Sequence, residues 1–125
     1  CPSQLGQAAA LWGMRNLAQW VAGERAEILD RRAAVAEGMA RLAGWRLAGC
    51  GAYFAWAEHP FALPSDAVAR AALAQQGILM LPGTMFAPPG DPRCTGALRI
   101  AFANVDRAGI GRLIDRLAAL DLPRA

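Results

Sequence analysis

Lysine is absent from this 125-residue sequence, and all 13 of its basic residues are arginine. A segment without lysine cannot form a Schiff base through a lysine amine, and it cannot hold a nucleotide with the lysine of a phosphate-binding loop. Both kinds of chemistry are therefore excluded from this stretch of chain. The arginines outnumber the 10 acidic residues and give a formal net charge of +3.

Cysteine and histidine are scarce. The three cysteines, Cys1, Cys50 and Cys94, are widely spaced and contain no Cys-x-x-Cys pair, so the sequence predicts neither a disulfide framework nor a zinc site. Reduced thiols are typical of the cytoplasm, and we expect a cytoplasmic protein. The single histidine, His59, lies beside Pro60 with no nucleophile nearby, which favours a surface or turn role over a catalytic one.

Long hydrophobic runs are also missing. No apolar run approaches the roughly 18 residues that a membrane span needs, and the run at residues 78–81 ends at Pro82. The N-terminus has neither a methionine nor the apolar core of a signal sequence, and we expect the chain to be part of a longer polypeptide. The arginines form no dense stripe with interleaved aromatic residues, which argues against nucleic-acid binding. A hydrophobic fraction of 55% with 18% charged residues predicts one ordered domain.

The first third of the chain has helical periodicity. Ser3 is a candidate helix cap, and Gly23 is expected to interrupt the helix or bend it. A second helix is expected from Glu24 to about Gly44, unless the two are one long, kinked helix that leads to a missing neighbour. The pattern rests on apolar positions Leu5, Ala8, Ala9, Trp12, Trp20 and Val21, then Ile28, Val35, Met39 and Leu42, with pairs Glu27/Arg31 and Glu37/Arg41 on the solvent side.

After Gly44 the period changes, and short strands alternate with helices. Strands are predicted at 45–48, 52–57, 78–81 and 97–103, with a turn at 49–51 and a long loop at 82–96. Helices are predicted from Ser65 to about Gln76, ended by Gly77, and from Asp106 onward. This order predicts an α/β (α+β) two-layer sandwich, a small mixed or antiparallel sheet covered by helices, after a long N-terminal connecting helix.

Arg99 is the outstanding candidate for a binding residue. Strand alternation puts it on the face opposite Leu98 and Ile100, flanked by alanines,. A half-buried guanidinium needs an anion, and its planar fork suits a carboxylate or phosphate. An internal salt bridge or a solvent-facing edge strand would also explain it. In the loop after residue 81, Gly83 would allow close backbone approach and Phe86 could wall a pocket, although the pattern by itself favours a turn with a core aromatic.

Four segments in order carry a resemblance that covers nearly the whole chain. They are Cys-Pro-Ser-Gln-Leu-Gly-Gln-Ala-Ala-Ala from residue 1, Gly-Ala-Tyr-Phe-Ala-Trp from residue 51, Gly-Ile-Leu-Met-Leu-Pro-Gly-Thr-Met-Phe from residue 77, and Ala-Leu-Arg-Ile-Ala-Phe-Ala from residue 97. Together they resemble the C-terminal part of a class I/II, fold-type I pyridoxal-phosphate-dependent aminotransferase. The resemblance implies that Arg99 receives the α-carboxylate of an amino-acid or 2-oxo-acid substrate, and that Gly83 and Phe86 belong to the loop at the substrate mouth.

The resemblance also implies what this chain lacks. The Schiff-base lysine and the residues that hold pyridoxal 5'-phosphate belong to a large domain upstream, so we expect no catalytic or cofactor-binding residue here and no activity or cofactor in the chain alone. Residues 1–23 would be a connecting helix, residues 24–125 the small domain, and the intact enzyme a homodimer. Two other interpretations stay open: a stand-alone α/β regulatory or small-anion-binding module, and a helical interaction module.

Overall fold

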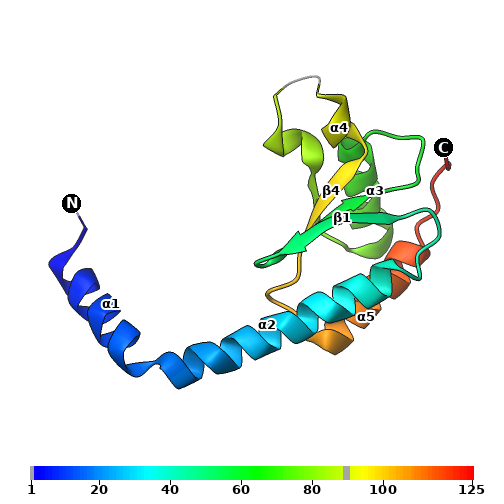
Figure 1. Cartoon of the computed structure of the whole chain (residues 1–125). Coiled ribbons are helices and arrows are strands. Elements are labelled where there is room, and N and C mark those ends of the chain that lie inside the picture. The colour runs from blue at the N-terminus through cyan, green and yellow to red at the C-terminus, as the bar shows by residue number, and fades with distance from the viewer. Residues whose placement is uncertain (1, 89–90) are drawn as a thin grey trace.

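The computed structural model describes residues 2–88 and 91–125. Within these ranges, four strands form an antiparallel sheet in the order β1-β2-β4-β3. Helices α2, α3 and α5 pack against one face of this sheet (Figure 1). The predicted two-layer sandwich is confirmed, and the sheet is antiparallel rather than mixed.

The N-terminal arm consists of helix α1 (Gln4–Asn16) and the first half of α2 (Ala18–Met39). Ser3 caps α1 as predicted, since its side chain accepts a hydrogen bond from the Gly6 N–H over 3.4 Å. The expected interruption at Gly23 is wrong: the chain bends at Leu17, and Gly23 lies inside α2. A single glycine costs a helix only about 1 kcal/mol, which its neighbours offset. Helix α1 buries none of its residues and extends away from the domain (Figure 1).

The second half of α2 packs against α5 (Arg107–Ala118). Gly38 allows close approach, because a Cβ atom there would lie 2.4 Å from Ile114 Cγ1. The Glu27–Arg31 pair forms at 2.9 Å, but Glu37 pairs with Arg107 instead of Arg41. Helix α2 ends at Met39, earlier than predicted, and the i,i+4 geometry that the expected pair requires is lost.

The hairpin of β1 (Arg46–Gly51) and β2 (Phe54–Glu58) turns later than the sequence predicts. Residues 49–51 are not the turn, because they continue β1 to the pair Gly51–Phe54. The turn lies at Ala52 and Tyr53, and Ala52 adopts a positive φ of 49°. A bulge between Leu47 and Gly49 absorbs the irregularity that the glycines cause,.

Helix α3 (Ser65–Gln76) follows Pro64, which occupies the capping position predicted for Ser65. The Ser65 hydroxyl is buried and donates to the Cys94 carbonyl over 3.3 Å. Gly77 ends the helix in the left-handed conformation, as predicted. Of the predicted strand at 78–81, only Leu81 joins β3 (Leu81–Pro82).

The predicted loop at 82–96 contains a one-turn 3₁₀ helix, η1 (Gly83–Phe86), and a short helix, α4 (Pro92–Thr95). Strand β4 (Ala97–Ala101) follows and lies between β2 and β3. Its alternation is as predicted: Leu98 and Ile100 are buried, together with Phe102. Asp106 caps α5 by accepting the Gly109 N–H at 2.7 Å. The core therefore occupies one face of the sheet, and the opposite, open face is covered in part, since Ala97 is buried there while Ala101 is exposed.

Candidate functional site

The open face of the sheet carries three large side chains from adjacent strands. Phe54 and Trp56 project from β2, alternating with the buried Ala55 and Ala57. Trp56 pairs directly with Arg99 of β4. Since β4 has a strand on each side, the interpretation of Arg99 as a residue of an edge strand is wrong.

Two aromatic rings hold the guanidinium of Arg99. Its Cζ lies over the Phe54 ring at 4.3 Å from the centroid, and over the Phe86 ring at 4.2 Å. Phe86 also contacts Trp56 edge to face, with centroids 5.9 Å apart. A cation at this distance from an aromatic face is attracted by the ring quadrupole. The fold thus brings Arg99 and Phe86, two candidates from the sequence, into contact.

Within residues 2–88 and 91–125, no ion pair or hydrogen bond engages the Arg99 side chain. The internal salt bridge considered above is therefore not found there. Arg99 is half-buried, and its N–H groups are suited to two parallel hydrogen bonds with a carboxylate. Chemically, this arrangement can accept a small anion.

Gly83 is the first residue of η1, the turn that ends at Phe86. It is buried, and a Cβ atom there would lie 2.6 Å from the Cys94 carbonyl oxygen and 2.9 Å from that of Ala97. The close approach is therefore to the chain's own backbone, which fixes η1 against α4 and β4. Asp91 caps α4, and hydrogen bonds from Arg93 lower the pKa of its carboxyl group to about 2.

His59 lies in a separate aromatic cluster with Trp45 and Phe61. Its Nδ1 accepts the Phe61 N–H at 3.3 Å, and burial lowers the pKa of the imidazole. It is half-buried in packing rather than on the surface.

Burial raises the pKa of the Cys50 thiol, an effect that Arg32 opposes. The described residues contain no cluster of three potential metal ligands.

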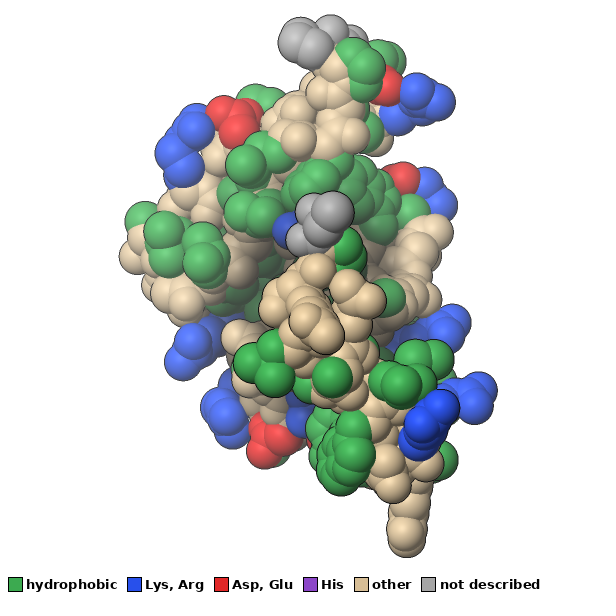
Figure 2. All heavy atoms as spheres, turned by 90° about the vertical axis from the view of Figure 1, so that its left-hand side faces the viewer, with side chains coloured by type: hydrophobic (Ala, Val, Ile, Leu, Met, Phe, Trp, Pro, Cys, Tyr) green, Lys and Arg blue, Asp and Glu red, His purple; other side chains and the backbone are tan. Residues whose placement is uncertain are grey.

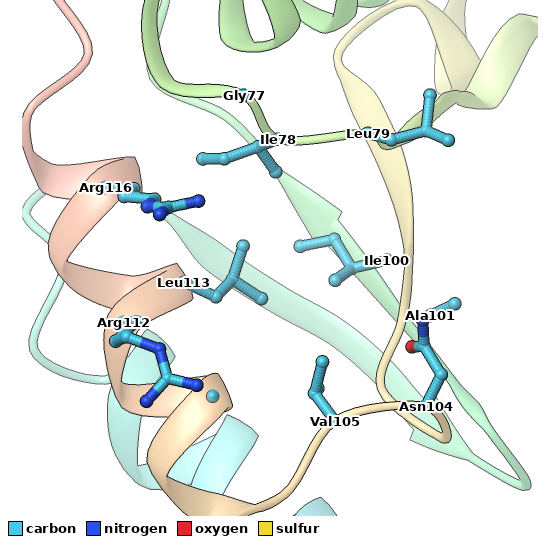
Figure 3. Close-up of a pocket in the computed structure, with 11 residues that line it drawn as sticks. Gly77, Ile78, Leu79, Ile100, Ala101, Asn104, Val105, Arg112, Leu113 and Arg116 are labelled. Carbon is cyan, nitrogen blue, oxygen red and sulfur yellow. The ribbon is translucent and has the colours of Figure 1, made fainter.

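Two hollows lie away from Arg99. One of about 360 Å³ lies between α5 and the segment after Gly77, with Arg112 and Arg116 at its rim (Figure 3). The other, of about 680 Å³, lies between α2 and the hairpin turn and is lined by Trp20 and Tyr53 among others. Neither hollow is lined by Arg99.

Phe54 and Trp56 were not singled out as site residues from the sequence, although a signal for them exists. In a strand with alternating alanines and aromatics, Phe54 and Trp56 share one face. What the pattern does not give is that β2 lies beside β4 in the register that places this face around Arg99.

Comparison with solved structures gives consistent matches to aminotransferases. An aminotransferase from Mycobacterium tuberculosis matches with a TM-score of 0.82 and 28% identity, over 95% of this chain and 30% of the other. The α-aminoadipate aminotransferase of Thermus thermophilus, solved with N-(5'-phosphopyridoxyl)-L-leucine, matches with a TM-score of 0.69 and 25% identity, over 86% and 27%. A mutant aspartate aminotransferase of Thermus thermophilus, at 22% identity and a TM-score of 0.79 over 96% and 32%, shows the shared fold alone.

Comparison with curated proteins gave no match. This chain spans about 30% of the length of the solved aminotransferases that it resembles. In the part of the chain that the structure describes, no helix is long and apolar enough to cross a membrane. The sequence profile described as aminotransferase class I and II matches residues 1–117. The chain therefore belongs to the class I and II aminotransferase family.

Proposed function

We propose that this chain is the small, C-terminal domain of a pyridoxal-phosphate-dependent aminotransferase and that Arg99 binds the α-carboxylate of its substrates. The observation that carries the proposal is the half-buried Arg99 on the open sheet face, without an anionic partner among the described residues. A guanidinium in this state gains most from a bidentate carboxylate, the group that every amino-acid and 2-oxo-acid substrate carries.

The cofactor does not fit the residues of this chain. There is no lysine to attach it, and the neighbours of Arg99 are aromatic rings rather than further donors for a phosphate. We therefore place pyridoxal 5'-phosphate on a large domain elsewhere in the same polypeptide, and we expect this chain alone to be inactive. When bound there, the cofactor supplies the electron sink for chemistry at the substrate α-carbon.

The role of this chain is then substrate orientation. Arg99 fixes the carboxylate, and the amino group of the substrate is directed away from the sheet, toward the missing domain. Holding a reactant in one orientation lowers the entropic part of the barrier. Gly83 keeps η1 in place, and Phe86 forms the wall beside the guanidinium.

The N-terminal arm has hydrophobic surface that a partner outside this chain could cover. Large hydrophobic side chains are exposed on α1 and on the first half of α2, namely Leu5, Leu11, Trp12, Met14, Trp20 and Val21. Seen from the side of the arm, hydrophobic side chains are exposed over much of this face, with arginines among them (Figure 2). Exposed apolar surface of this extent marks an interface. We propose that the large domain and a second subunit of a cytoplasmic homodimer cover it, with residues 1–23 as the connecting helix.

The test is the substitution Arg99→Ala in the full-length protein, with Arg99→Lys as a second variant. Two charge-assisted hydrogen bonds contribute about 1.5–3 kcal/mol each, so Arg99→Ala should lower kcat/KM by about 10²–10⁴-fold for every amino donor, since about 1.4 kcal/mol corresponds to a factor of ten. Arg99→Lys should recover only part of the loss, because an ammonium cannot bind bidentately. Arg116→Ala, an exposed arginine at the 360 Å³ hollow, is the control. Unchanged kinetics in Arg99→Ala would contradict the proposal.

A further inference from the structure

We propose that Phe54 and Phe86 are positioning residues, whose ring faces hold the Arg99 guanidinium so that its N–H groups meet the substrate carboxylate in one orientation. This inference rests on the function proposed for Arg99. It adds two residues that act through the arginine by a cation–π contact rather than by touching the reacting atoms.

The two rings reach Arg99 from different parts of the chain. Phe54 lies on β2, diagonally across from Arg99, because it pairs with Ala101 two positions along β4. Phe86 lies at the end of η1. Even so, the guanidinium carbon lies at nearly the same distance from both ring centroids, 4.3 and 4.2 Å. Two independent elements therefore converge on one cation.

Neither ring has a place in the hydrophobic core. Phe54 is 38% and Phe86 is 45% exposed, while the core is built from the opposite face of the sheet. The contacts that the structure gives these rings are with Arg99 and, for Phe86, with the edge of Trp56. Both rings therefore lie against the arginine and outside the core.

A held guanidinium has a consequence for binding. An arginine side chain has several rotatable bonds, and ordering them on ligand binding opposes affinity. Two aromatic faces order the group before the ligand arrives, and they leave N–H donors without a protein partner among the described residues. Weakening the contact should therefore weaken carboxylate binding, with little effect on the chemical step.

The test varies the ring quadrupole and nearly preserves ring shape. In the full-length protein, Phe86 and Phe54 are replaced in turn by 4-fluoro- and 3,4,5-trifluorophenylalanine, because fluorination withdraws electron density from the ring face. The readouts are the inhibition constant of propionate, a carboxylate without an amino group, and the KM and kcat of an amino donor with 2-oxoglutarate as acceptor. We expect the inhibition constant and KM to rise stepwise, by about 3–10-fold in total at either position, with kcat changed less than twofold.

Matched variants separate positioning from packing. The same series at Phe102, which is fully buried in the core, should change stability but not the inhibition constant. Phe86→Leu should lose as much as the trifluoro variant or more, and Phe86→Tyr, which keeps an aromatic face, should lose less than Phe86→Leu. In an Arg99→Ala background, the series should have no effect on the inhibition constant.

The outcomes distinguish this inference from the function on which it rests. If Arg99→Ala weakens propionate but the fluorinated series leaves it unchanged, the positioning role is overturned and the proposed function stands. If Arg99→Ala itself leaves propionate binding and kinetics unchanged, both are overturned. A series effect that persists without Arg99 would also overturn the inference, since the rings would then act on the ligand directly.

Discussion

Gly83→Ala is the substitution that best tests how the fold builds the site. Gly83 is buried, and its backbone conformation does not itself require glycine, since its φ is not positive. The added Cβ would lie 2.6 and 2.9 Å from the carbonyl oxygens of Cys94 and Ala97, and 3.1 Å from Trp56 Cζ2. Backbone oxygens cannot rotate away as a side chain can, so η1 must move by several tenths of an ångström.

The size of the effect follows from two opposing contributions. Overpacking of this kind costs about 1–3 kcal/mol, and alanine lowers the entropy of the unfolded chain enough to return about 0.4–1 kcal/mol. We expect a net loss of about 1–2 kcal/mol in the free energy of unfolding. Because Phe86 lies three residues along the same turn, its ring should leave Arg99, and the KM for amino donors should rise.

The assay is urea denaturation together with steady-state kinetics on the full-length protein. Gly96→Ala is the matched control, because that glycine lies in the same region and a Cβ there would meet nothing within 4 Å. The control should change the free energy of unfolding by less than about 0.5 kcal/mol. If Gly83→Ala is as stable as Gly96→Ala and keeps its KM, the close packing of η1 is not what positions Phe86.

Three further predictions concern the rest of the domain. Gly38→Ala should lower the free energy of unfolding by up to about 2 kcal/mol, because its Cβ would collide with Ile114 of α5,. Gly23→Ala in the same helix should raise the free energy of unfolding by about 0.5–1 kcal/mol. Urea titration of both variants checks this, and equal effects would refute the helix contact. Burial lowers the pKa of His59, so the folded state binds fewer protons than the unfolded state, and stability should fall as the pH drops through about 6.5. In His59→Gln, the urea midpoint should depend less on pH between pH 7.5 and 5.5. An unaltered pH dependence would show that another group is responsible. Asp106→Ala removes the cap of α5 and should cost about 0.5–2 kcal/mol by thermal or urea unfolding, while Asp115→Ala in the same helix should cost less; the reverse order would contradict the capping role.

Some elements could be predicted from the sequence because their causes are local. Ser3 and Asp106 cap helices through their own side chains, and Gly77 ends a helix because glycine tolerates the left-handed conformation,. The faces of β4 follow from alternation alone,. Elements that depend on neighbours were placed wrongly. The hairpin turn lies at residues 52–53 instead of 49–51 because pairing with β2 keeps the glycine-rich segment extended, and Glu37 pairs with α5 rather than within its own helix.

The features of the site likewise divide into those with local causes and those that depend on tertiary structure. The sequence alone determined that the chain has no lysine, and that Arg99 lies on the strand face opposite the core, because composition and a period of two require no partner,. Only the tertiary structure decided what surrounds Arg99. Strand order brings Phe54 of β2 beside it, and the buried Gly83 lets η1 carry Phe86 to it. Contacts between segments more than ten residues apart depend on register and packing, which a pattern along the chain does not contain.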